Sequence, residues 1–459
     1  MKILLIQPAK APKTIGGEDV FIYEPLALEY LASGVKGDHD VKILDMRIDK
    51  NLDSQMQKFR PDVVGITAYT VHVNTVKNLF NKIKTINPDI FTVVGGHHAT
   101  VAPEDFFTPY IDLVVMGEGV FVFKEIISRF VSKRPFNGIA GISYLKGKER
   151  VMNPPEPTTD LDIFPFPARE LTEKYRKYYY SEWMKPLASI RTSKGCPNRC
   201  NFCALWKLTG GKYLKRKPEN IVRELSGIKE KYVFFADDES LVDARRMKIL
   251  AELIKEAGIK KRYFLYGRGD TIVKNPDLIK IWKDIGLERV FVGLEFFRDE
   301  DLKYINKGST VENNKEAVKI LNANGIEIYA SFIVRPDFNE EDFKEFKEYC
   351  RGMDLNFLSF AVLTPLPGTD LYEEVKDNLI TTDYDLFDFI HTQLPTKLPL
   401  KEFFNNLNSL YFDTIPLGKS ISFLRKYPLK EIPGLISLRM KVAGQMKNAY
   451  MDYETKGEK

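Results

Sequence analysis

The sequence predicts an α/β protein with a doubly wound, Rossmann-like first domain, a partial TIM-type (β/α)6 barrel and a helical C-terminal region. Two series of short apolar runs alternate with amphipathic stretches, one over residues 1–135 and one over 181–380. Runs that are apolar at every position are typical of parallel strands covered by helices on both faces. Five prolines at positions 154, 155, 157, 165 and 167 separate the two series. Such a segment cannot continue a helix or a central strand, so residues 136–180 are predicted to be a hairpin and a linker.

The first series predicts five parallel strands, over residues 3–6, 41–44, 63–66, 91–94 and 113–115. Ligands of this architecture bind at the carboxyl ends of the strands. Glycines at such ends let a large ligand approach the backbone. The candidate binding residues at these ends are Gln7, Thr67, Tyr69, Gly95, Gly96, His98, Gly117 and Glu118.

The second series predicts six strands, over residues 188–192, 232–236, 263–266, 290–293, 327–334 and 357–362. Six β/α units are fewer than the eight of a closed barrel, so a partial barrel is expected. Beyond residue 381 the strand pattern is lost, and residues 381–459 are predicted to be helical.

Three of the four cysteines, Cys196, Cys200 and Cys203, lie in one short segment that follows the first barrel strand. Three thiolates can hold three irons of a [4Fe-4S] cluster and leave one iron open, because most such clusters use four protein ligands. The alternative is a zinc site, which needs a fourth Cys or His at short spacing. The nearest other cysteine is Cys350, which we interpret as a buried apolar residue.

The spacing Cys196-x3-Cys200-x-Phe202-Cys203 resembles the signature of the radical S-adenosylmethionine (SAM) superfamily. In that family the open iron binds the amino and carboxylate groups of SAM, and electron transfer yields a 5'-deoxyadenosyl radical. The resemblance implies SAM contacts from Phe202, Asp237, Asp238, Arg268, Glu295 and Pro367. The alternatives are a helix cap for the aspartate pair and ordinary ion pairs for Arg268 and Glu295. The sequence does not identify which residues are catalytic.

A Rossmann-like domain before a radical SAM core resembles the cobalamin-binding subclass, and residues 23–28, 94–100, 102–104 and 116–119 resemble its motifs. The sequence lacks Asp-x-His-x-x-Gly, so axial ligation of cobalt by histidine is not expected. His98, and less strongly His97, is expected to contact the corrin or its nucleotide tail; the alternative is a loop hydrogen-bond network. No G-x-G-x-x-G follows the first strand, which argues against a dinucleotide. No cysteine precedes Cys196, which argues against a methylthiotransferase.

Residues 191–197, 263–270, 337–338, 384–388 and 394–400 resemble the hopanoid C-3 methylase family, although the resemblance ends near residue 417. It implies a cobalamin-dependent methyltransferase that modifies an unactivated carbon of a hopanoid-like or other isoprenoid lipid. Its cofactors would be a [4Fe-4S] cluster, SAM and cobalamin, with an external flavodoxin or ferredoxin as electron donor. The alternatives are a radical SAM cyclase or oxidoreductase of the same architecture, and a non-catalytic cobalamin-responsive protein.

The composition excludes several classes of protein. A net charge of +5, the difference between 68 basic and 63 acidic residues, is weak evidence for nucleic acid, and none is expected as a partner. Four cysteines with three in one cluster favour a reducing compartment, and no run of eighteen apolar residues occurs, so a cytoplasmic protein is expected. The tail contains Phe403, Phe404, Phe412 and Phe423 and six basic residues between 419 and 441. Peripheral membrane contact and simple core packing both remain open for this tail.

Overall fold

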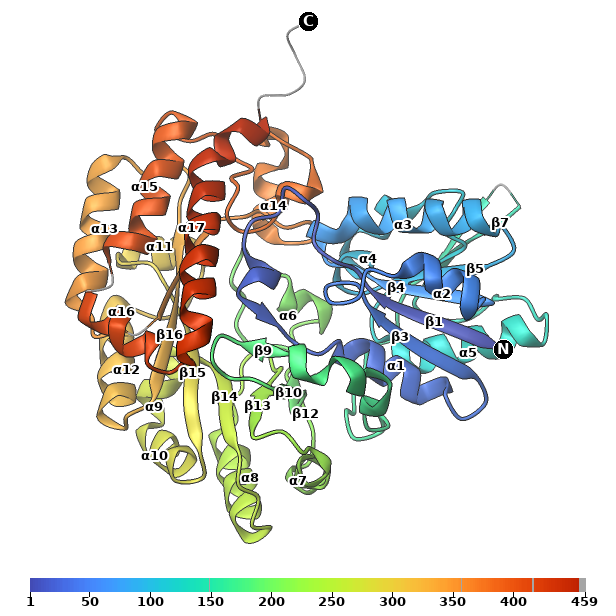
Figure 1. The fold of residues 1–459 in the computed structure, drawn as a ribbon, viewed down its shortest axis with the longest axis horizontal. Helices are drawn as coiled ribbons and strands as arrows, with labels where there is room; N and C mark the ends of the chain where they lie inside the picture. Colours follow the sequence, from blue (N-terminus) through green and yellow to red (C-terminus); the bar gives the residue numbers. More distant parts are fainter. Residues whose placement is uncertain (148, 356, 415–416, 454–459) are drawn as a thin grey trace, which may run out of the picture.

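The computed structural model describes residues 1–147, 149–355, 357–414 and 417–453, and it contains two large sheets that lie side by side (Figure 1). The first sheet has the order β3-β1-β4-β5-β6-β7-β8. Its first five strands are parallel, whereas β7 and β8 are antiparallel. The strands are β1 (Lys2–Gln7), β3 (Asp40–Asp45), β4 (Val63–Thr67), β5 (Phe91–Gly95), β6 (Leu113–Val115), β7 (Ile142–Lys146) and β8 (Glu149–Asn153).

Helices cover both faces of this sheet, as predicted for a doubly wound domain. One apolar cluster joins the sheet to α1 (Leu26–Val35) and α5 (Gly119–Val131). A second cluster, on the opposite face, joins it to α2 (Leu52–Lys58) and α3 (Val73–Ile86). The short helix α4 (His97–Val101) starts directly after β5. The predicted hairpin forms as β7 and β8 and pairs with β6, so it extends the first sheet.

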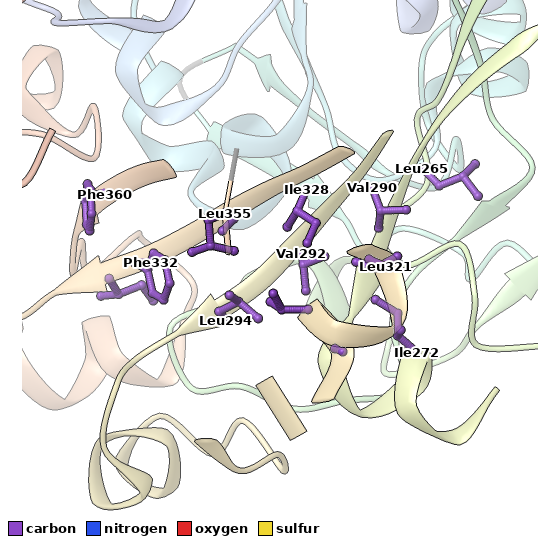
Figure 2. Close-up of a cluster of buried hydrophobic side chains, with 14 of the residues drawn as sticks. Leu265, Ile272, Val290, Val292, Leu294, Leu321, Ile328, Phe332, Leu355 and Phe360 are labelled. Atoms are coloured by element: carbon purple, nitrogen blue, oxygen red, sulfur yellow. The ribbon is translucent and has the colours of Figure 1, made fainter. Parts of the chain in front are cut away.

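The second sheet has six parallel strands in the order β10-β13-β14-β15-β16-β17, which makes an open, partial barrel. Its strands are β10 (Leu187–Ile190), β13 (Tyr232–Phe235), β14 (Arg262–Arg268), β15 (Leu287–Glu295), β16 (Glu327–Val334) and β17 (Phe357–Val362). The helices between them are α6 (Leu205–Leu208), α7 (Pro218–Gly227), α8 (Ala244–Glu256), α9 (Gly269–Lys274), α10 (Pro276–Asp284), α11 (Asp299–Tyr304), α12 (Val311–Ala323) and α13 (Glu340–Gly352). Figure 2 shows side chains of β14 to β17 gathered with those of α9 and α12 in the buried cluster that joins strands to helices.

The inner face of the barrel carries aromatic side chains instead of aliphatic ones. Ring contacts run from Tyr23 to Phe234 (4.6 Å between centroids), from Tyr266 to Phe291 (4.8 Å) and from Phe291 to Tyr329 (5.2 Å). We call Tyr23, Trp183, Phe234, Phe264, Tyr266, Phe291, Tyr329 and Phe357 the inner aromatic face. Several of its rings are only partly buried although they point into the barrel.

An ionic group lies at the amino ends of the barrel strands, below the inner aromatic face. Arg289 is fully buried and pairs with Glu327 and Glu182. Lys426 contacts Glu327 from the C-terminal region and lies over the Trp183 ring, 4.7 Å from its centroid. Each buried charge therefore has an opposite partner, which offsets its cost of desolvation.

The C-terminal region is helical, as predicted, with α15 (Leu400–Asp413), α16 (Leu417–Leu424) and α17 (Ile432–Asn448), and it follows α14 (Asp370–Val375) at the end of the barrel segment. Phe403 and Phe404 are fully buried in the barrel core, which confirms the core-packing interpretation for these two. Phe423 of α16 meets Phe357 of β17 with ring centroids 4.3 Å apart. The buried His391 contacts Asp388 (Nδ1 to Oδ2, 2.9 Å) and Asp452 (Nε2 to Oδ2, 3.1 Å), which ties the last described turn to the barrel.

Residues 8–24, which we call the strap, leave the first sheet and cross to the barrel (Figure 1). Ile15 is 3% exposed and belongs to the barrel core. Its backbone N–H donates to Asp388 Oδ2 at 2.8 Å. Within the strap, β2 (Phe21–Ile22) pairs with β9 (Tyr180–Ser181) of the proline-rich segment. The two domains are therefore joined by packed side chains as well as by the linker.

Candidate active site between the two domains

A cavity of about 280 Å³ lies between the carboxyl ends of the first sheet and the cysteine side of the barrel. Residues from both domains line it, which agrees with ligand binding at the carboxyl ends of parallel strands. The first domain contributes Thr67, Tyr69, Gly95, Gly96, His97, Gly117 and Glu118, among others. The second contributes Arg191, Ser193, Lys194, Leu205, Leu208, Thr209, Ala236 and Asp238.

Glycines form much of the wall on the side of the first domain. Gly96 has a φ of +106°, and a Cβ on it would lie 2.7 Å from Thr67 Oγ1 and 2.8 Å from the Ala68 backbone. Gly117, with a φ of +79°, would place a Cβ 3.0 Å from Pro155. A larger residue at either position would collide with neighbouring protein atoms, so glycine is required there and the wall at these points is backbone. A wall of backbone suits a broad, flat ligand such as a corrin ring.

The two adjacent histidines have opposite environments. His97 lines the cavity, and its ring lies edge-on to Tyr69 with centroids 4.8 Å apart. The side chain of His97 is exposed at the cavity, so a ligand there can reach its ring. His98 is fully buried and directs both ring nitrogens to other side chains, Nδ1 to Thr70 (3.1 Å) and Nε2 to Asp105 (2.9 Å). The hydrogen-bond alternative thus describes His98, and His97 takes the position at the cavity.

The other strand-end candidates divide in a similar way. Thr67, Tyr69, Gly95, Gly96 and Gly117 line the cavity. The described residues that line it do not include Gln7, which is buried with its amide 3.4 Å from the Pro8 carbonyl oxygen. The first strand therefore ends beside the cavity without contributing this side chain to it.

Glu118 joins the two domains at the edge of the cavity. Its Oε2 accepts from Arg191 Nη1 at 3.2 Å and from Lys194 Nζ at 3.0 Å. Burial alone would raise the pKa of Glu118, but the two cations outweigh it and lower the pKa below the ordinary value. Arg191 also lies over the Tyr30 ring, 4.7 Å from its centroid. Glu118 is therefore already paired, and its role here is to connect the domains.

The cysteine loop is held from two sides. Gly195, with a φ of +87°, starts the loop at a position where a Cβ would lie 2.1 Å from the Lys212 carbonyl oxygen. On the other side, Asn201 donates from its backbone N–H to the Ile305 carbonyl oxygen (3.1 Å), and Asn306 Nδ2 donates to the Arg199 carbonyl oxygen (2.7 Å). The loop is thus held by protein contacts on both of its sides.

The cysteine loop combines buried thiols with a positive charge beside one of them. Burial raises the pKa of Cys203 to about 12 and also raises that of Cys200, so neither thiol ionises by itself at neutral pH. Arg268 Nη1 lies 3.9 Å from Cys200 Sγ and offers a positive charge to a thiolate there. Three sulfurs on one tethered loop, with a guanidinium beside them, fit a [4Fe-4S] cluster with one open iron. Cys350 lies elsewhere and is buried, as predicted.

The two aspartates that follow β13, Asp237 and Asp238, have different surroundings. Asp237 is buried and accepts three hydrogen bonds, from Thr192 N (2.6 Å), Thr192 Oγ1 (2.5 Å) and Ser193 N (2.8 Å). Asp238 lines the cavity and accepts only from Gly195 N at 2.6 Å among the described residues. Burial is the main cause that raises the pKa of Asp238. Of the pair, only Asp238 has a carboxylate that faces the cavity.

Comparisons with known proteins agree with this geometry. The family model of the B12 binding domain matches residues 12–127, and that of the Radical SAM superfamily matches residues 190–350. Hopanoid C-3 methylase of Methylococcus capsulatus is 33% identical over 415 residues, which cover 89% of this chain and 79% of that protein. An uncharacterized methyltransferase of Pyrococcus horikoshii is 33% identical over 399 residues, which cover 83% of this chain and 85% of that protein.

The chain belongs to the cobalamin-binding radical SAM methyltransferases. Their cofactors are a [4Fe-4S] cluster, SAM and cobalamin. The anaerobic magnesium-protoporphyrin IX monomethyl ester cyclase of Rubrivivax gelatinosus is also related, at 29% identity over 85% of this chain and 73% of that protein.

Two solved structures share the fold of this methyltransferase. The cobalamin-dependent SAM radical enzyme OxsB has a TM-score of 0.73 and 17% identity, over 98% of this chain and 72% of that chain. The radical SAM methyltransferase TsrM from Kitasatospora setae has a TM-score of 0.65 and 20% identity, over 82% of this chain and 78% of that chain. At these identities the likeness confirms the two-domain α/β fold and nothing finer.

The remaining predicted SAM residues of the methyltransferase surround the cysteine loop. Arg268 is buried, pairs with Asp270 (Nε to Oδ1, 2.9 Å) and donates to the Lys307 carbonyl oxygen. Glu295 has a φ of +62° and accepts from Lys307 Nζ at 2.5 Å. Phe202 packs against the barrel core. Pro367 is buried, and a Cβ on the next residue, Gly368, would lie 2.7 Å from Val101 of the first domain.

Sequence reasoning missed two buried charges at this site of the methyltransferase. Lys307 neutralises Glu295 and lies in the segment that tethers the cysteine loop. Glu239 is buried with Oε2 unpaired among the described residues, and burial raises its pKa to about 7. Glu239 directly follows the two aspartates that the sequence analysis selected, so its position was a usable signal. No local pattern identifies Lys307, because its partner Glu295 lies twelve residues earlier, at a position with positive φ.

Proposed function

We propose that the enzyme transfers a methyl group to an unactivated carbon of a hopanoid-like or other isoprenoid lipid. The observation that supports this most is the inner aromatic face beneath the interdomain cavity. Ala236 lines the cavity and also packs against the inner aromatic face, so the two adjoin at this residue. In this proposal the substrate lies against the aromatic rings, next to the cavity.

The chemistry of these rings favours an apolar substrate. Tyr266, Phe291 and Tyr329 touch one another in sequence across three neighbouring strands and are each partly exposed within the barrel. Partly exposed aromatic rings gain by covering apolar ligand surface, at about 0.8 kcal/mol for each buried CH2 group. An isoprenoid ring system offers many such groups and few that need hydrogen bonds. The charges at the amino ends of the strands are already paired with one another, so they do not require a charged substrate.

Bound cofactors supply the radical that abstracts hydrogen and the methyl group that replaces it. The chain's own residues then bind, orient and shield. In this proposal Cys196, Cys200 and Cys203 ligate the cluster, and Asp238 accepts a hydrogen bond from the SAM ammonium group, for which a carboxylate in a shielded site is well suited. Phe202, Arg268, Glu295 and Pro367 complete the SAM site.

The cobalamin side of the proposal rests on the glycine wall. Gly95, Gly96 and Gly117 provide the close approach to the ring, and Thr67 and Tyr69 provide polar contacts at its rim. His97 replaces His98 in our assignment, because only His97 faces the cavity. Glu118 and Arg191 connect the domains above the barrel and so keep water from the radical, which a radical enzyme must do.

The decisive experiment is anaerobic turnover of the reconstituted enzyme with deuteromethyl-labelled SAM, a chemical reductant and a total apolar lipid extract from cells that lack the gene. We expect one labelled methyl group in an isoprenoid lipid, together with 5'-deoxyadenosine. The variant Phe291→Ala should still cleave SAM but lose labelled lipid, because the contact surface is removed and the cofactors are not. Phe121→Ala removes an exposed phenylalanine of α5 that lies outside the inner aromatic face, so it is the matched control and should retain both products.

Two outcomes would contradict the proposal. Formation of 5'-deoxyadenosine with a new ring or carbon–carbon bond and no label would support a cyclase or oxidoreductase, as the relative from Rubrivivax gelatinosus is named. Failure to cleave SAM at all would support a cobalamin-responsive binding protein.

The remaining parts of the proposal concern partners and location. Electrons come from an external flavodoxin or ferredoxin, nucleic acid is not a partner, and the enzyme works in the cytoplasm at the membrane surface. Among the described residues no helix has both the length and the apolar content that a membrane crossing requires.

A further inference from the structure

The C-terminal segment 417–453 differs in charge from the rest of the chain. It contains seven Lys or Arg residues and two Asp or Glu residues. This excess of five equals the net charge of the whole protein, so residues outside the segment are neutral in sum. One of its two acids, Asp452, is turned inward to His391. Two of its bases, Lys426 and Lys441, pair with Glu327 and Asp19, whereas Arg425 and Lys430 are exposed, so the outward side of the segment is basic.

The same segment exposes large apolar side chains. Leu429 is 85% exposed, Met440 64%, Ile436 53% and Ile421 47%. Ile436 and Met440 lie four residues apart on α17 and so project from one side of that helix. Isolated exposed apolar residues are common, but a set on one short segment, interspersed with basic residues, marks an interaction surface.

The opposite side of this segment closes the barrel. Phe423 contacts Phe357, and Lys426 lies over Trp183, both on the inner aromatic face. On α17, Lys441 reaches Asp19 of the strap, with Nζ 3.4 Å from Oδ1. The helix α17 packs against α15, and its Met446 belongs to the barrel core cluster. The segment with the exposed apolar and basic side chains therefore also covers part of the inner aromatic face.

We propose that residues 417–441 form a docking surface for an anionic lipid bilayer, which delivers the lipid substrate to the barrel. Basic residues near such a membrane contribute about 1 kcal/mol each, and exposed apolar residues enter the region between headgroups and acyl chains. Neither element binds firmly alone, and their combination is typical of a reversible peripheral contact. The delivery step depends on the function proposed above, whereas the docking itself does not.

The experiment measures co-sedimentation of the reconstituted full-length enzyme with vesicles. Vesicles of phosphatidylcholine alone are compared with vesicles that also contain phosphatidylglycerol. We expect binding to the anionic vesicles only, and we expect it to be lost at high salt, because the Debye length falls to about 3 Å at 1 M. Equal binding to both kinds of vesicle, or binding to neither, would overturn the proposal.

Two double variants separate the charges from the apolar side chains. Arg425→Gln with Lys430→Gln should weaken binding about fivefold for each charge removed. Leu429→Ser with Met440→Ser should weaken binding comparably on the anionic vesicles. All four residues are exposed and distant from the cysteine loop, so iron content and thermal stability should stay at wild-type values. The matched control Ile163→Ser removes an equally exposed apolar residue from the linker and should not affect binding.

Further measurements separate this proposal from its competitors. If the apolar variant changes the oligomeric state in analytical ultracentrifugation and leaves vesicle binding intact, the surface binds a second copy of the chain and the proposal is wrong. The proposal is also wrong if nucleic acid, added at the same concentration of negative charge, displaces the enzyme from the vesicles. If wild type and variants modify detergent-solubilised lipid equally while only wild type modifies vesicle lipid, docking delivers the substrate. If vesicles bind but no lipid is methylated in either form, docking stands and the proposed function fails.

Discussion

Asp237 accepts three hydrogen bonds that fix the segment leading into the cysteine loop, and Asp237→Ala removes all of them. A hydrogen bond to a charged group contributes about 1.5–3 kcal/mol, and each buried donor that is left unpaired costs about 1–3 kcal/mol. These effects are not additive, because the three bonds share one acceptor. We expect the free energy of unfolding to fall by about 3–5 kcal/mol, which corresponds to a decrease in Tm of about 3–5 °C for a chain of 459 residues.

Asp238→Asn changes the neighbouring residue but should act on ligand binding instead. The amide oxygen of asparagine can still accept from Gly195 N, so stability should change by less than about 1 kcal/mol. The lost charge faces the cavity. A charge-assisted hydrogen bond to an ammonium group is worth about 1.5–3 kcal/mol, so SAM affinity should fall about 10- to 100-fold.

The assay compares both variants with wild type after anaerobic reconstitution. Thermal unfolding is followed by circular dichroism, iron content by colorimetry, and SAM affinity by equilibrium dialysis. Asp243→Ala is the matched control, since it removes a helix-capping aspartate outside the cavity and should cost only about 1 kcal/mol. The reasoning is refuted if Asp237→Ala unfolds like wild type and fails to bind SAM while Asp238→Asn binds it normally.

Three further changes test other parts of the site and fold. Gly96→Ala forces a Cβ against the neighbouring strand end and should abolish cobalamin uptake, which is measured by absorbance. The control Gly258→Ala also lies at positive φ, but it has open space around it, so it should lower stability without affecting cobalamin uptake. Lys307→Met leaves a buried carboxylate unpaired and should cost about 3–5 kcal/mol in thermal unfolding; Lys307→Arg should recover most of this, and an unchanged melt would disprove the pairing. Burial alone would lower the pKa of His391, but its two aspartate partners raise it above 6.5. The stability from its charged form is therefore complete below pH 6.5 and is lost as the pH rises through the raised pKa, so wild type should lose its advantage over His391→Gln in melts at increasing pH; a constant difference would argue against this.

Local sequence patterns predicted the elements well where hydrophobicity decides the structure. The apolar runs of the barrel gave strands at 327–334 and 357–362 with the bounds that the structure has. Parallel strands buried on both faces leave an uninterrupted apolar signal, so their positions can be read locally. The cysteine motif can also be recognised locally, because all three predicted cluster ligands lie in one short loop.

Contacts between distant parts of the chain could not be predicted in this way. His97 and His98 are adjacent, and only the partners Thr70 and Asp105 decide which one turns into the core. Ile15 carries no sign in the sequence that it completes the core of a different domain. The split between Asp237 and Asp238 depends likewise on backbone donors some forty-five residues earlier. Each of these features is determined by tertiary packing, which hydrophobic periodicity and motif spacing do not predict.

The strap has a consequence for how the holoenzyme is assembled. Ile15 of the strap is buried in the barrel core, while the end of the strap continues into α1 of the first domain. Widening the interdomain cavity would therefore pull Ile15 out of its apolar surroundings. Exchange of the bulky cobalamin should therefore be much slower than exchange of the smaller SAM.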